Sequence, residues 1–413
     1  MRSMTATINL LLSLALTLVS ARAVPPVLIL AGAGNSVDAA ILEFDPVAGS
    51  LAVKGYTSGG DNDFKGWFSR HPINPNIIIS CNDQSTPFSI GNISSFLLDP
   101  ASGNLTLLDK KNSGGIETPD GVSAAHTAFF PSGDVVGVAN YYGQGASTFK
   151  FNAADGTIGE AINTDGILTW ANYTIRNGQL PDDQNTSHPH EIVTHPFLPV
   201  LYIPDLGEDV LRSFTIGEGG KLTVQATYPQ KLGSGPRHAA ISSNGKFLYL
   251  LHELGVTLSV YSVDLSAHST GRLTLLQEGV TIYPANATFS LTISAAEVRI
   301  SNDGRFLYAT NRNLTTTPFV EGDVVDTVSV YGINDDGRIK RIQSAAIPSS
   351  RGLRGFELSP ATTTPNVGGQ DYVVVGGQIT NNTSVLKRSR IDGTLQFVAS
   401  VPLRISPITF IWV

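Results

Sequence analysis

Ionisable and amide side chains recur in this sequence where predicted β-hairpins begin and end. The start of a first strand and the end of the next lie at the same end of a hairpin, so residues about 14–16 positions apart should meet. A site for a polar small molecule needs such convergence, whereas hydrophobic strand positions do not. The pairs are Trp67 with Asn82, His126 with Asn140, His190 with Asp205, Arg237 with Glu253, Glu297 with Arg312, and Arg354 with Gln378 across an inserted loop.

These residue types predict the handling of anions and protons. Arginine grips a carboxylate or phosphate in bidentate fashion with a permanent charge, and histidine exchanges a proton near neutral pH. Any single histidine could instead hydrogen-bond loops and neighbouring strands, but the set favours a site. The histidines at strand ends are His126, His188, His190, His238 and His252.

A repeated unit of strands must position these side chains. Each unit comprises a strand, a tight turn at Pro or at Asn/Asp-Gly, a second strand, a polar loop, a third strand and a weaker fourth strand. Four-stranded units that recur about every 45–65 residues are typical of a β-propeller. The first strands of six units begin near residues 67, 125, 190, 237, 296 and 354.

The seventh unit is divided between the two ends of the chain. Residues 27–34 and 40–46 resemble its later strands, and residues 407–413 resemble the missing first strand. We therefore predict an all-β fold, a seven-bladed β-propeller over residues 24–413 whose first blade is closed by the C-terminal strand.

Composition excludes several classes of protein. The 413 residues carry a net charge of −7 with no basic run, which argues against a nucleic-acid partner. The hydrophobic content of 41% is ample for a large core. With Cys81 as the single cysteine, the chain can form no intrachain disulfide. The sequence has no G-x-S-x-G motif, so a serine-hydrolase elbow is not expected.

The N-terminus predicts export. Residues 1–23 combine Arg2, an apolar stretch and Ala21-Arg22-Ala23, which fits a cleaved signal peptide. We expect a secreted or cell-wall-associated glycoprotein with no membrane segment after cleavage. The glycosylation sequons lie at Asn92, Asn104, Asn172, Asn185, Asn286, Asn313, Asn381 and Asn382.

Four strings of the sequence carry a family resemblance. GPRHAAIS, YIPDLGEDVL, AAEVRISNDGRFLYATNR and RGFELSP resemble the seven-bladed lactonase family, which includes 6-phosphogluconolactonases of the cycloisomerase type and fungal carboxy-cis,cis-muconate cyclases. The resemblance covers essentially the whole mature chain. Asn-Glu-Leu is replaced here by His252-Glu253-Leu254, Ser-Asn-Arg by Thr310-Asn311-Arg312, and residues 361–370 are inserted.

The resemblance implies a catalytic set of His190, Arg237, Glu253 and Arg312. Such groups suit attack of water on a lactone carbonyl, with one group removing the proton of the water and a cation stabilising the oxyanion. Glu253 could be the base or an orienting partner. The reverse reaction, closure of a lactone from an unsaturated dicarboxylate, needs the same grip on an anion.

The remaining strand-end residues are expected to contact an anionic lactone or dicarboxylate. His188 and His190 with Asp205 could also bind a divalent ion, but the family is cofactor-free, so we expect no cofactor and no metal. We expect a monomer, and the alternative function is an extracellular binding or surface glycoprotein that uses the propeller as a scaffold. The predicted substrate-binding residues are His126, Asn140, His188, Asp205, His238, Glu297, Asn311, Arg354 and Gln378.

Overall fold

The computed structural model describes most of the chain. The predicted signal peptide and nearly all of the inserted segment 361–370 lie outside the described residues. The described residues are 25–82, 91–118, 120–162, 168–169, 184–266, 269–283, 292–314, 326–348, 350–360 and 370–413.

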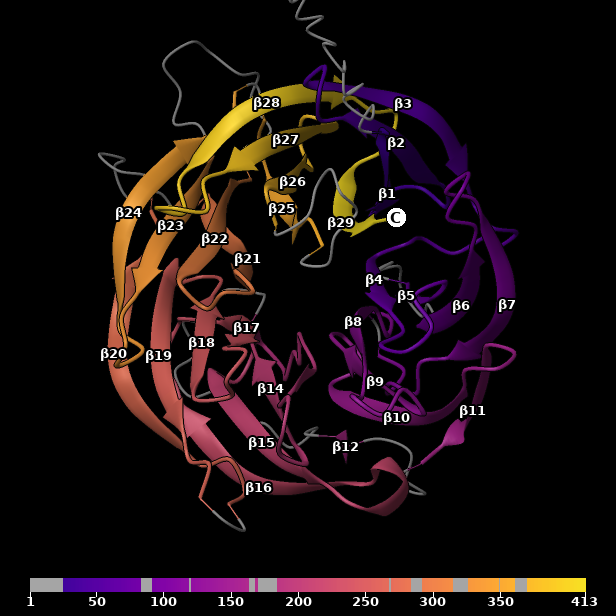
Figure 1. The fold of residues 1–413 in the computed structure, drawn as a ribbon. Helices are drawn as coiled ribbons and strands as arrows, with labels where there is room; N and C mark the ends of the chain where they lie inside the picture. Colours follow the sequence, from indigo (N-terminus) through magenta and orange to yellow (C-terminus); the bar gives the residue numbers. More distant parts are fainter. Residues whose placement is uncertain are drawn as a thin grey trace, which may run out of the picture.

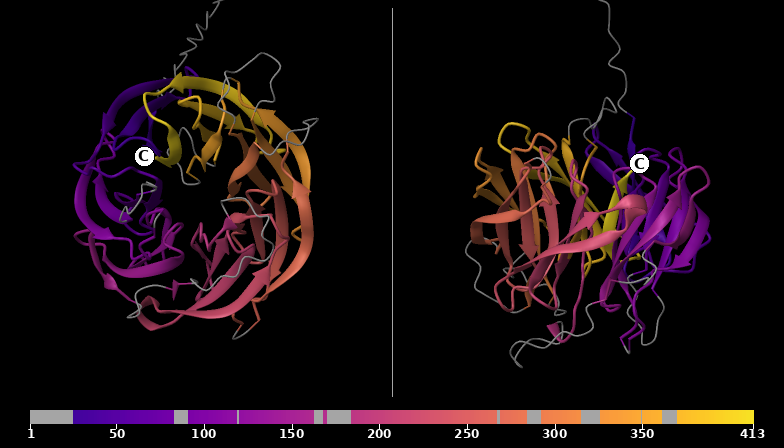
Figure 2. Two further views of the ribbon diagram at one scale, coloured as in Figure 1. Left: turned by 180° about the vertical axis from the view of Figure 1, so that it is seen from behind. Right: turned by 90° about the horizontal axis from the view of Figure 1, so that it is seen from below.

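Seven antiparallel sheets stand as blades around one axis (Figure 1). Each blade has four strands, and the blade of β8 to β11 also includes the short strand β12 (Leu168–Thr169). Helical structure within the described ranges is limited to 3-10 geometry, at η2 (Glu218–Gly220) and at Gln184. The edge-on view in Figure 2 shows the blades side by side around the ring. The predicted seven-bladed propeller is therefore confirmed.

The two ends of the chain share one blade. Strand β29 (Pro407–Trp412) pairs antiparallel with β1 (Val27–Ala33), with Ile411 opposite Leu30. The blade continues through β2 (Ala39–Asp45) to its outer strand, so the C-terminal strand supplies the innermost position, as predicted (Figure 1).

The innermost strands line the axis, and most of them contact the innermost strand of the next blade. Besides β29, they are β4 (Trp67–Arg70), β8 (Ala124–Phe129), β13 (Val193–Thr194), β17 (Pro236–Ile241), β21 (Ile293–Ile300) and β25 (Leu353–Leu358).

The second and third strands of each blade are the most buried, because both their faces pack against neighbouring blades. Besides β1, the second strands are β5 (Ile77–Cys81), β9 (Val135–Asn140), β14 (Val200–Asp205), β18 (Phe247–His252), β22 (Phe306–Asn313) and β26 (Tyr372–Gly377). Besides β2, the third strands are β6 (Asn92–Leu98), β10 (Gly145–Asn152), β15 (Val210–Ile216), β19 (Thr257–Val263), β23 (Thr327–Ile333) and β27 (Asn382–Arg388).

The outer strands alternate between exposed and buried residues, as half-solvated strands do. In β7, for example, Leu105 is buried and its neighbour Thr106 is exposed. The outer strands are β3 (Ser50–Thr57), β7 (Leu105–Asn112), β11 (Thr157–Ala161), β16 (Leu222–Pro229), β20 (Leu273–Thr281), β24 (Ile339–Ala346) and β28 (Leu395–Pro402).

The hydrophobic core lies in the seams between blades. One cluster joins the first blade to the last, where the Phe44 ring meets Tyr372 edge-on at 4.8 Å and Trp412 at 6.3 Å. Such seams hold the blades in a closed ring and thereby set the distances between strand ends of different blades. No helix in the described part of the chain is long and apolar enough to span a membrane.

Candidate active site

A cavity of about 190 Å³ lies where several innermost strands begin. Its wall contains all four residues of the predicted catalytic set, His190, Arg237, Glu253 and Arg312, together with Arg354 from the predicted substrate-binding group. The other residues that line it are Ser123, Ala125, Tyr141 and Tyr142. The ring thus brings side chains from five consecutive blades to one solvent-reachable space.

β-Bulges place three of these residues. The pairing register contains one extra residue at Ala125 in β8, one at Arg237 in β17, and one across Arg354 and Gly355 in β25. A bulge leaves the extra residue unpaired and turns its side chain out of the regular alternation of the strand. The same irregularity near the start of these strands therefore points residues of different blades at the same cavity.

Glu253 lies between two arginines. Its Oε2 is 2.8 Å from Nε of Arg237, and its Oε1 pairs with Nη2 of Arg312, whose Nε donates to Ser294 Oγ at 3.0 Å. Burial by itself raises the pKa of Glu253, but the positive charges of Arg312, Arg237 and Arg354 together leave the pKa lowered. Glu253 is therefore an ionised carboxylate that orients the arginines, and it is a poor proton acceptor.

The cavity has an excess of positive charge. Three guanidinium groups and the carboxylate of Glu253 line it. Burial lowers the pKa of Arg312 to about 10, helped by its arginine neighbours and opposed by Glu253, so Arg312 remains protonated at neutral pH. This arrangement can hold an anionic group.

His190 presents a neutral imidazole to the cavity. Its Nδ1 is 3.2 Å from Nε2 of His238, and the ring of Tyr141 meets its ring edge-on at 5.4 Å. Burial lowers the pKa of His190 well below its usual value, and the nearby charge of Arg237 lowers it further. A neutral imidazole beside cations and an anion site can accept a proton from water.

Two of the predicted substrate-binding residues lie behind the cavity wall. His238 contacts His190 through Nε2, and its Nδ1 is 3.0 Å from Oε1 of Glu297. Both His238 and Glu297 are 1% exposed. They contact protein groups, so the structure places them as supports of the cavity wall.

His126 is outside the cavity lining, and its ring centroid lies 5.8 Å from that of His238. Its Nε2 is 3.6 Å from Oε1 of Glu191, and its ring packs at 4.4 Å on Trp67. Burial lowers the pKa of His126 to about 3 and raises that of Glu191 to about 8. This pair belongs to the packed centre of the ring.

His188 and Asp205 build the rim beside the cavity. The ring of His188 stacks on Tyr141 at 4.3 Å, and its main-chain N–H donates to Asp205 Oδ1 at 2.8 Å. The other oxygen of Asp205 accepts from Arg212 Nη1 at 2.6 Å. Arg212 and the backbone thus hold both oxygens of Asp205. Within the described ranges no group of three His, Cys, Asp or Glu is placed to hold a metal.

The remaining predicted ligands make protein contacts at strand ends. Asn140 donates to the backbone oxygen of Ser113 at 3.2 Å, and Asn311 donates to Asp326 at 3.1 Å. The backbone N–H of Gln378 donates to Gly352 at 2.8 Å. These contacts join strand ends to loops.

The aromatic wall of the cavity was not predicted. Tyr141 and Tyr142 directly follow Asn140, which the sequence places at the end of a second strand, so the same positional rule extended by two residues would have found them. Ser123 and Ala125 carry no chemical signal in the sequence, and only the bulge of β8 brings Ala125 to the cavity.

The sequons differ in exposure. Asn104 and Asn185 are exposed, whereas Asn313 is 8% exposed and Asn382 is 7% exposed. The Asn382 amide also donates to Ser350 at 2.7 Å, so a glycan there would have to displace packed protein. Asn172 and Asn286 lie outside the described residues. Glycosylation stays a prediction, and the exposed sequons are its better sites.

Comparison with known proteins places this architecture in a family. The family model described as "Lactonase, 7-bladed beta-propeller" matches residues 66–410. A 6-phosphogluconolactonase of Formosa agariphila is 26% identical over 310 residues, which cover 74% of this chain and 76% of the relative. A 6-phosphogluconolactonase of Serratia proteamaculans is 27% identical over 53% of this chain and 59% of the relative.

Solved structures agree in fold. The periplasmic gluconolactonase of Pseudomonas aeruginosa superposes with a TM-score of 0.74 at 22% sequence identity, covering 94% of this chain and 99% of that chain. At this identity the likeness shows the fold alone. The family match, however, extends over most of the chain, and the chain therefore belongs to the lactonase family of seven-bladed β-propellers.

Proposed function

We propose that this protein is a cofactor-independent lactonase that hydrolyses a lactone bearing a carboxylate or phosphate. The observation that carries the proposal is the single cavity in which neutral His190, ionised Glu253 and three arginines meet. Relatives named 6-phosphogluconolactonase support the reaction class.

The reaction uses His190 as the general base. Water gives a proton to the imidazole of His190 while its oxygen bonds to the lactone carbonyl carbon, and the carbonyl electron pair moves onto oxygen. Arginine stabilises that oxyanion. The intermediate then collapses, the ring C–O bond breaks, and the leaving alkoxide takes the proton back from His190. The product is a hydroxy acid, and the enzyme returns to its starting state.

Glu253 prepares the arginines for this task. Because its two oxygens engage Arg237 and Arg312, it fixes both guanidinium planes before substrate arrives. Preorganised charge of this kind does not have to reorient as the oxyanion forms, which is why it lowers the barrier. Lactone closure from an unsaturated dicarboxylate would use the same arginines and remains the alternative direction.

The predicted export bears on the substrate. A 6-phosphorylated sugar lactone is an intracellular metabolite, so a secreted enzyme would rarely meet one. We propose an extracellular carboxylated lactone instead, for which the positive cavity and the predicted signal peptide are the two supports.

The test is a panel of carboxylated, phosphorylated and neutral lactones, assayed by proton release with the secreted protein. We expect turnover of an anionic lactone and loss of about 100-fold or more in kcat for His190→Gln. Arg338→Gln, which removes an arginine of an exposed ion pair with Asp336, serves as the matched control.

Two results would contradict the proposal. One is full activity in His190→Gln. The other is absence of turnover across the panel together with saturable binding of a glycan or protein, which would favour the scaffold alternative suggested by the predicted signal peptide and sequons.

A further inference from the structure

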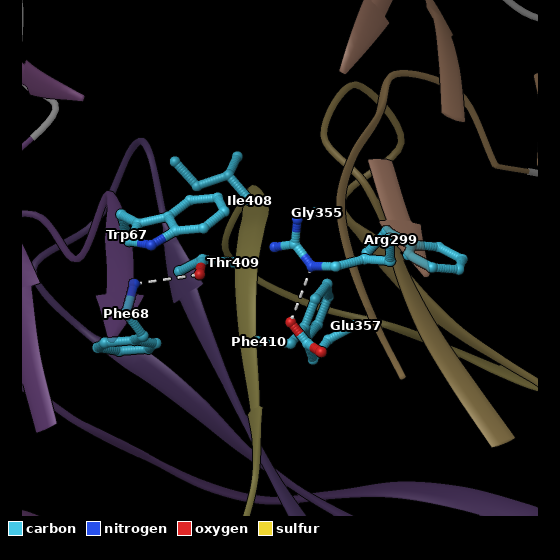
Figure 3. Close-up of a pocket in the computed structure, with 9 residues that line it drawn as sticks. Trp67, Phe68, Arg299, Gly355, Glu357, Ile408, Thr409 and Phe410 are labelled. Atoms are coloured by element: carbon cyan, nitrogen blue, oxygen red, sulfur yellow. Dashed lines mark hydrogen bonds and ion pairs between the residues drawn. The ribbon is translucent and has the colours of Figure 1, made fainter. Parts of the chain in front are cut away.

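A chain of polar groups, fully buried from His190 to Glu297, runs from the cavity to Arg299 and Glu357. His190 contacts His238, His238 contacts Glu297, and Glu297 Oε2 lies 2.8 Å from Arg299 Nη1. Arg299 also pairs with Glu357 at 3.3 Å and lies 5.5 Å from the ring of Trp67. Figure 3 shows Arg299 turned toward Glu357 in a second, small cavity beside β29.

The contacts of His238 determine where its proton resides. Nη1 of Arg237 lies 3.0 Å from His238 Nε2, and a guanidinium can only donate, so Nε2 must be the acceptor. Burial and the charge of Arg237 lower the pKa of His238 well below its usual value, so the ring is neutral and carries its proton on Nδ1. The carboxylate of Glu297, 3.0 Å away, favours a proton at that nitrogen.

The tautomer of His190 follows from this assignment. His190 Nδ1 lies 3.2 Å from the same Nε2 of His238. That atom has a lone pair and no proton, so its contact with His190 is a hydrogen bond only when His190 Nδ1 donates. The lone pair is shared with Arg237 Nη1, which also donates to the backbone oxygen of Ala296. A neutral imidazole with its proton on Nδ1 has its lone pair on Nε2.

We infer that His238, held by Glu297 and Arg237, is a positioning residue that keeps His190 in the Nδ1–H tautomer, with the basic Nε2 available to the cavity. The inference rests on the proposed function for its catalytic meaning, but the tautomer itself can be observed without any substrate. The sequence had predicted that His238 and Glu297 contact substrate. In this role they instead act through His190, which His238 contacts directly.

The experiment combines histidine nitrogen NMR with kinetics. The chain has eight histidines, so selective ¹⁵N-histidine labelling, assigned with His190→Gln, gives a resolvable set. We expect the Nδ1–H tautomer for His190 in the wild-type protein. In His238→Leu the acceptor is lost and we expect the proton on Nε2, with kcat lower by about 100-fold or more. His238→Gln places an amide oxygen near the former Nε2 position and should restore the tautomer and much of kcat.

The matched control is His195→Gln. His195 is likewise buried, and its Nε2 contacts the backbone oxygen of Gly245, away from the cavity. Activity per folded molecule should be unchanged in this variant, and thermal unfolding of all variants corrects for lost protein.

The possible results distinguish the positioning of His190 by His238 from the proposed lactonase function. An Nε2–H tautomer for His190 in the wild type, or a loss of kcat in His238→Leu no greater than in His195→Gln, would overturn the inference. A wild-type protein with the Nδ1–H tautomer but no lactone turnover would refute the proposed function and still support the positioning of His190 by His238.

Discussion

The surroundings of His190 and Glu253 give the two residues different roles. His190 is the base, and Glu253 holds the arginines in place. His190 is buried and the side chain of Glu253 is only 13% exposed, yet Glu253 has arginines at both oxygens while His190 has the neutral ring of His238 as its neighbour. Burial favours the uncharged form of each group, and only Glu253 has enough opposite charge nearby to stay ionised. The environment therefore assigns proton transfer to His190.

A pH profile tests this division. Protonation of His190 removes the base, and its pKa is lowered well below the usual value of 6.5, first by burial and then by Arg237. Activity should therefore stay level as the pH falls from 8 through 6.5 and decline only at lower pH. The measurement is kcat for an anionic lactone from pH 4 to 8, and a decline with its midpoint near pH 6.5 would contradict the assignment.

Arg354 tests the anion site separately from the base. Its guanidinium lines the cavity beside those of Arg237 and Arg312, which both pair with Glu253. Arg354→Gln should raise KM for an anionic lactone about 10-fold or more. It should change KM little for a neutral one. Arg338→Gln again provides the surface control, and an equal rise in KM for both classes of substrate would contradict a role in anion binding.

At the scale of elements, carboxylates tie the third strand of one blade to the entry of the next. Asp326 directly precedes β23 and accepts the backbone N–H of Asn313 at 2.7 Å and of Gly352 at 2.5 Å. Asp209 directly precedes β15 and accepts the N–H of Gly235 at 2.7 Å. In each case the carboxylate fixes the loop just before an innermost strand that carries a cavity arginine.

Loss of the Asp326 carboxylate should loosen that loop. In Asp326→Ala the N–H groups of Asn313 and Gly352 lose their acceptor, which should destabilise the fold by about 1–3 kcal/mol. The loss of stability should be accompanied by lower kcat/KM, because Gly352 leads into Arg354. Chemical denaturation and kinetics measure both effects.

Asp336→Ala is the matched control for Asp326. Asp336 pairs with Arg338 at an exposed turn, and its side chain is 55% exposed. Its removal should change stability by less than about 0.5 kcal/mol. Equal effects of the two substitutions would contradict the tie between blades.

At the scale of the whole molecule, closure of the ring depends on β29. Ile411 is 7% exposed and packs in a cluster with residues of the first and second blades, among them Leu30 and Phe68. Ile411→Asp should place a charge in this seam and destabilise the protein by about 3–5 kcal/mol. Thermal unfolding and size-exclusion chromatography report the loss.

Leu108→Asp is the control for the seam. Leu108 lies on the outer strand β7 and is 37% exposed, so a charge there remains solvated. We expect a much smaller effect on the unfolding temperature. An equal fall in unfolding temperature for Leu108→Asp and Ile411→Asp would contradict the dependence of ring closure on β29.

The residues alone were enough to predict the strand repeats, the divided first blade and the hairpin ends at which ionisable residues occur. These features are local, because alternation, turn residues and hairpin length follow from neighbouring positions along the chain. For that reason the strand-end pairs that contain His190, Arg237, Glu253 and Arg312 could be named in advance, and the family resemblance implied that these four form the catalytic set.

Which of those residues share the cavity could be seen only in the assembled ring. Arg237 and Arg354 reach it through bulges, Tyr141 and Tyr142 form its aromatic wall, and His238 lies behind it. These placements depend on distances between blades, and the packed seams and the closing strand set those distances. The protonation of Glu253 and His190 follows in turn, because it depends on which charges the closed ring brings within reach of each buried group.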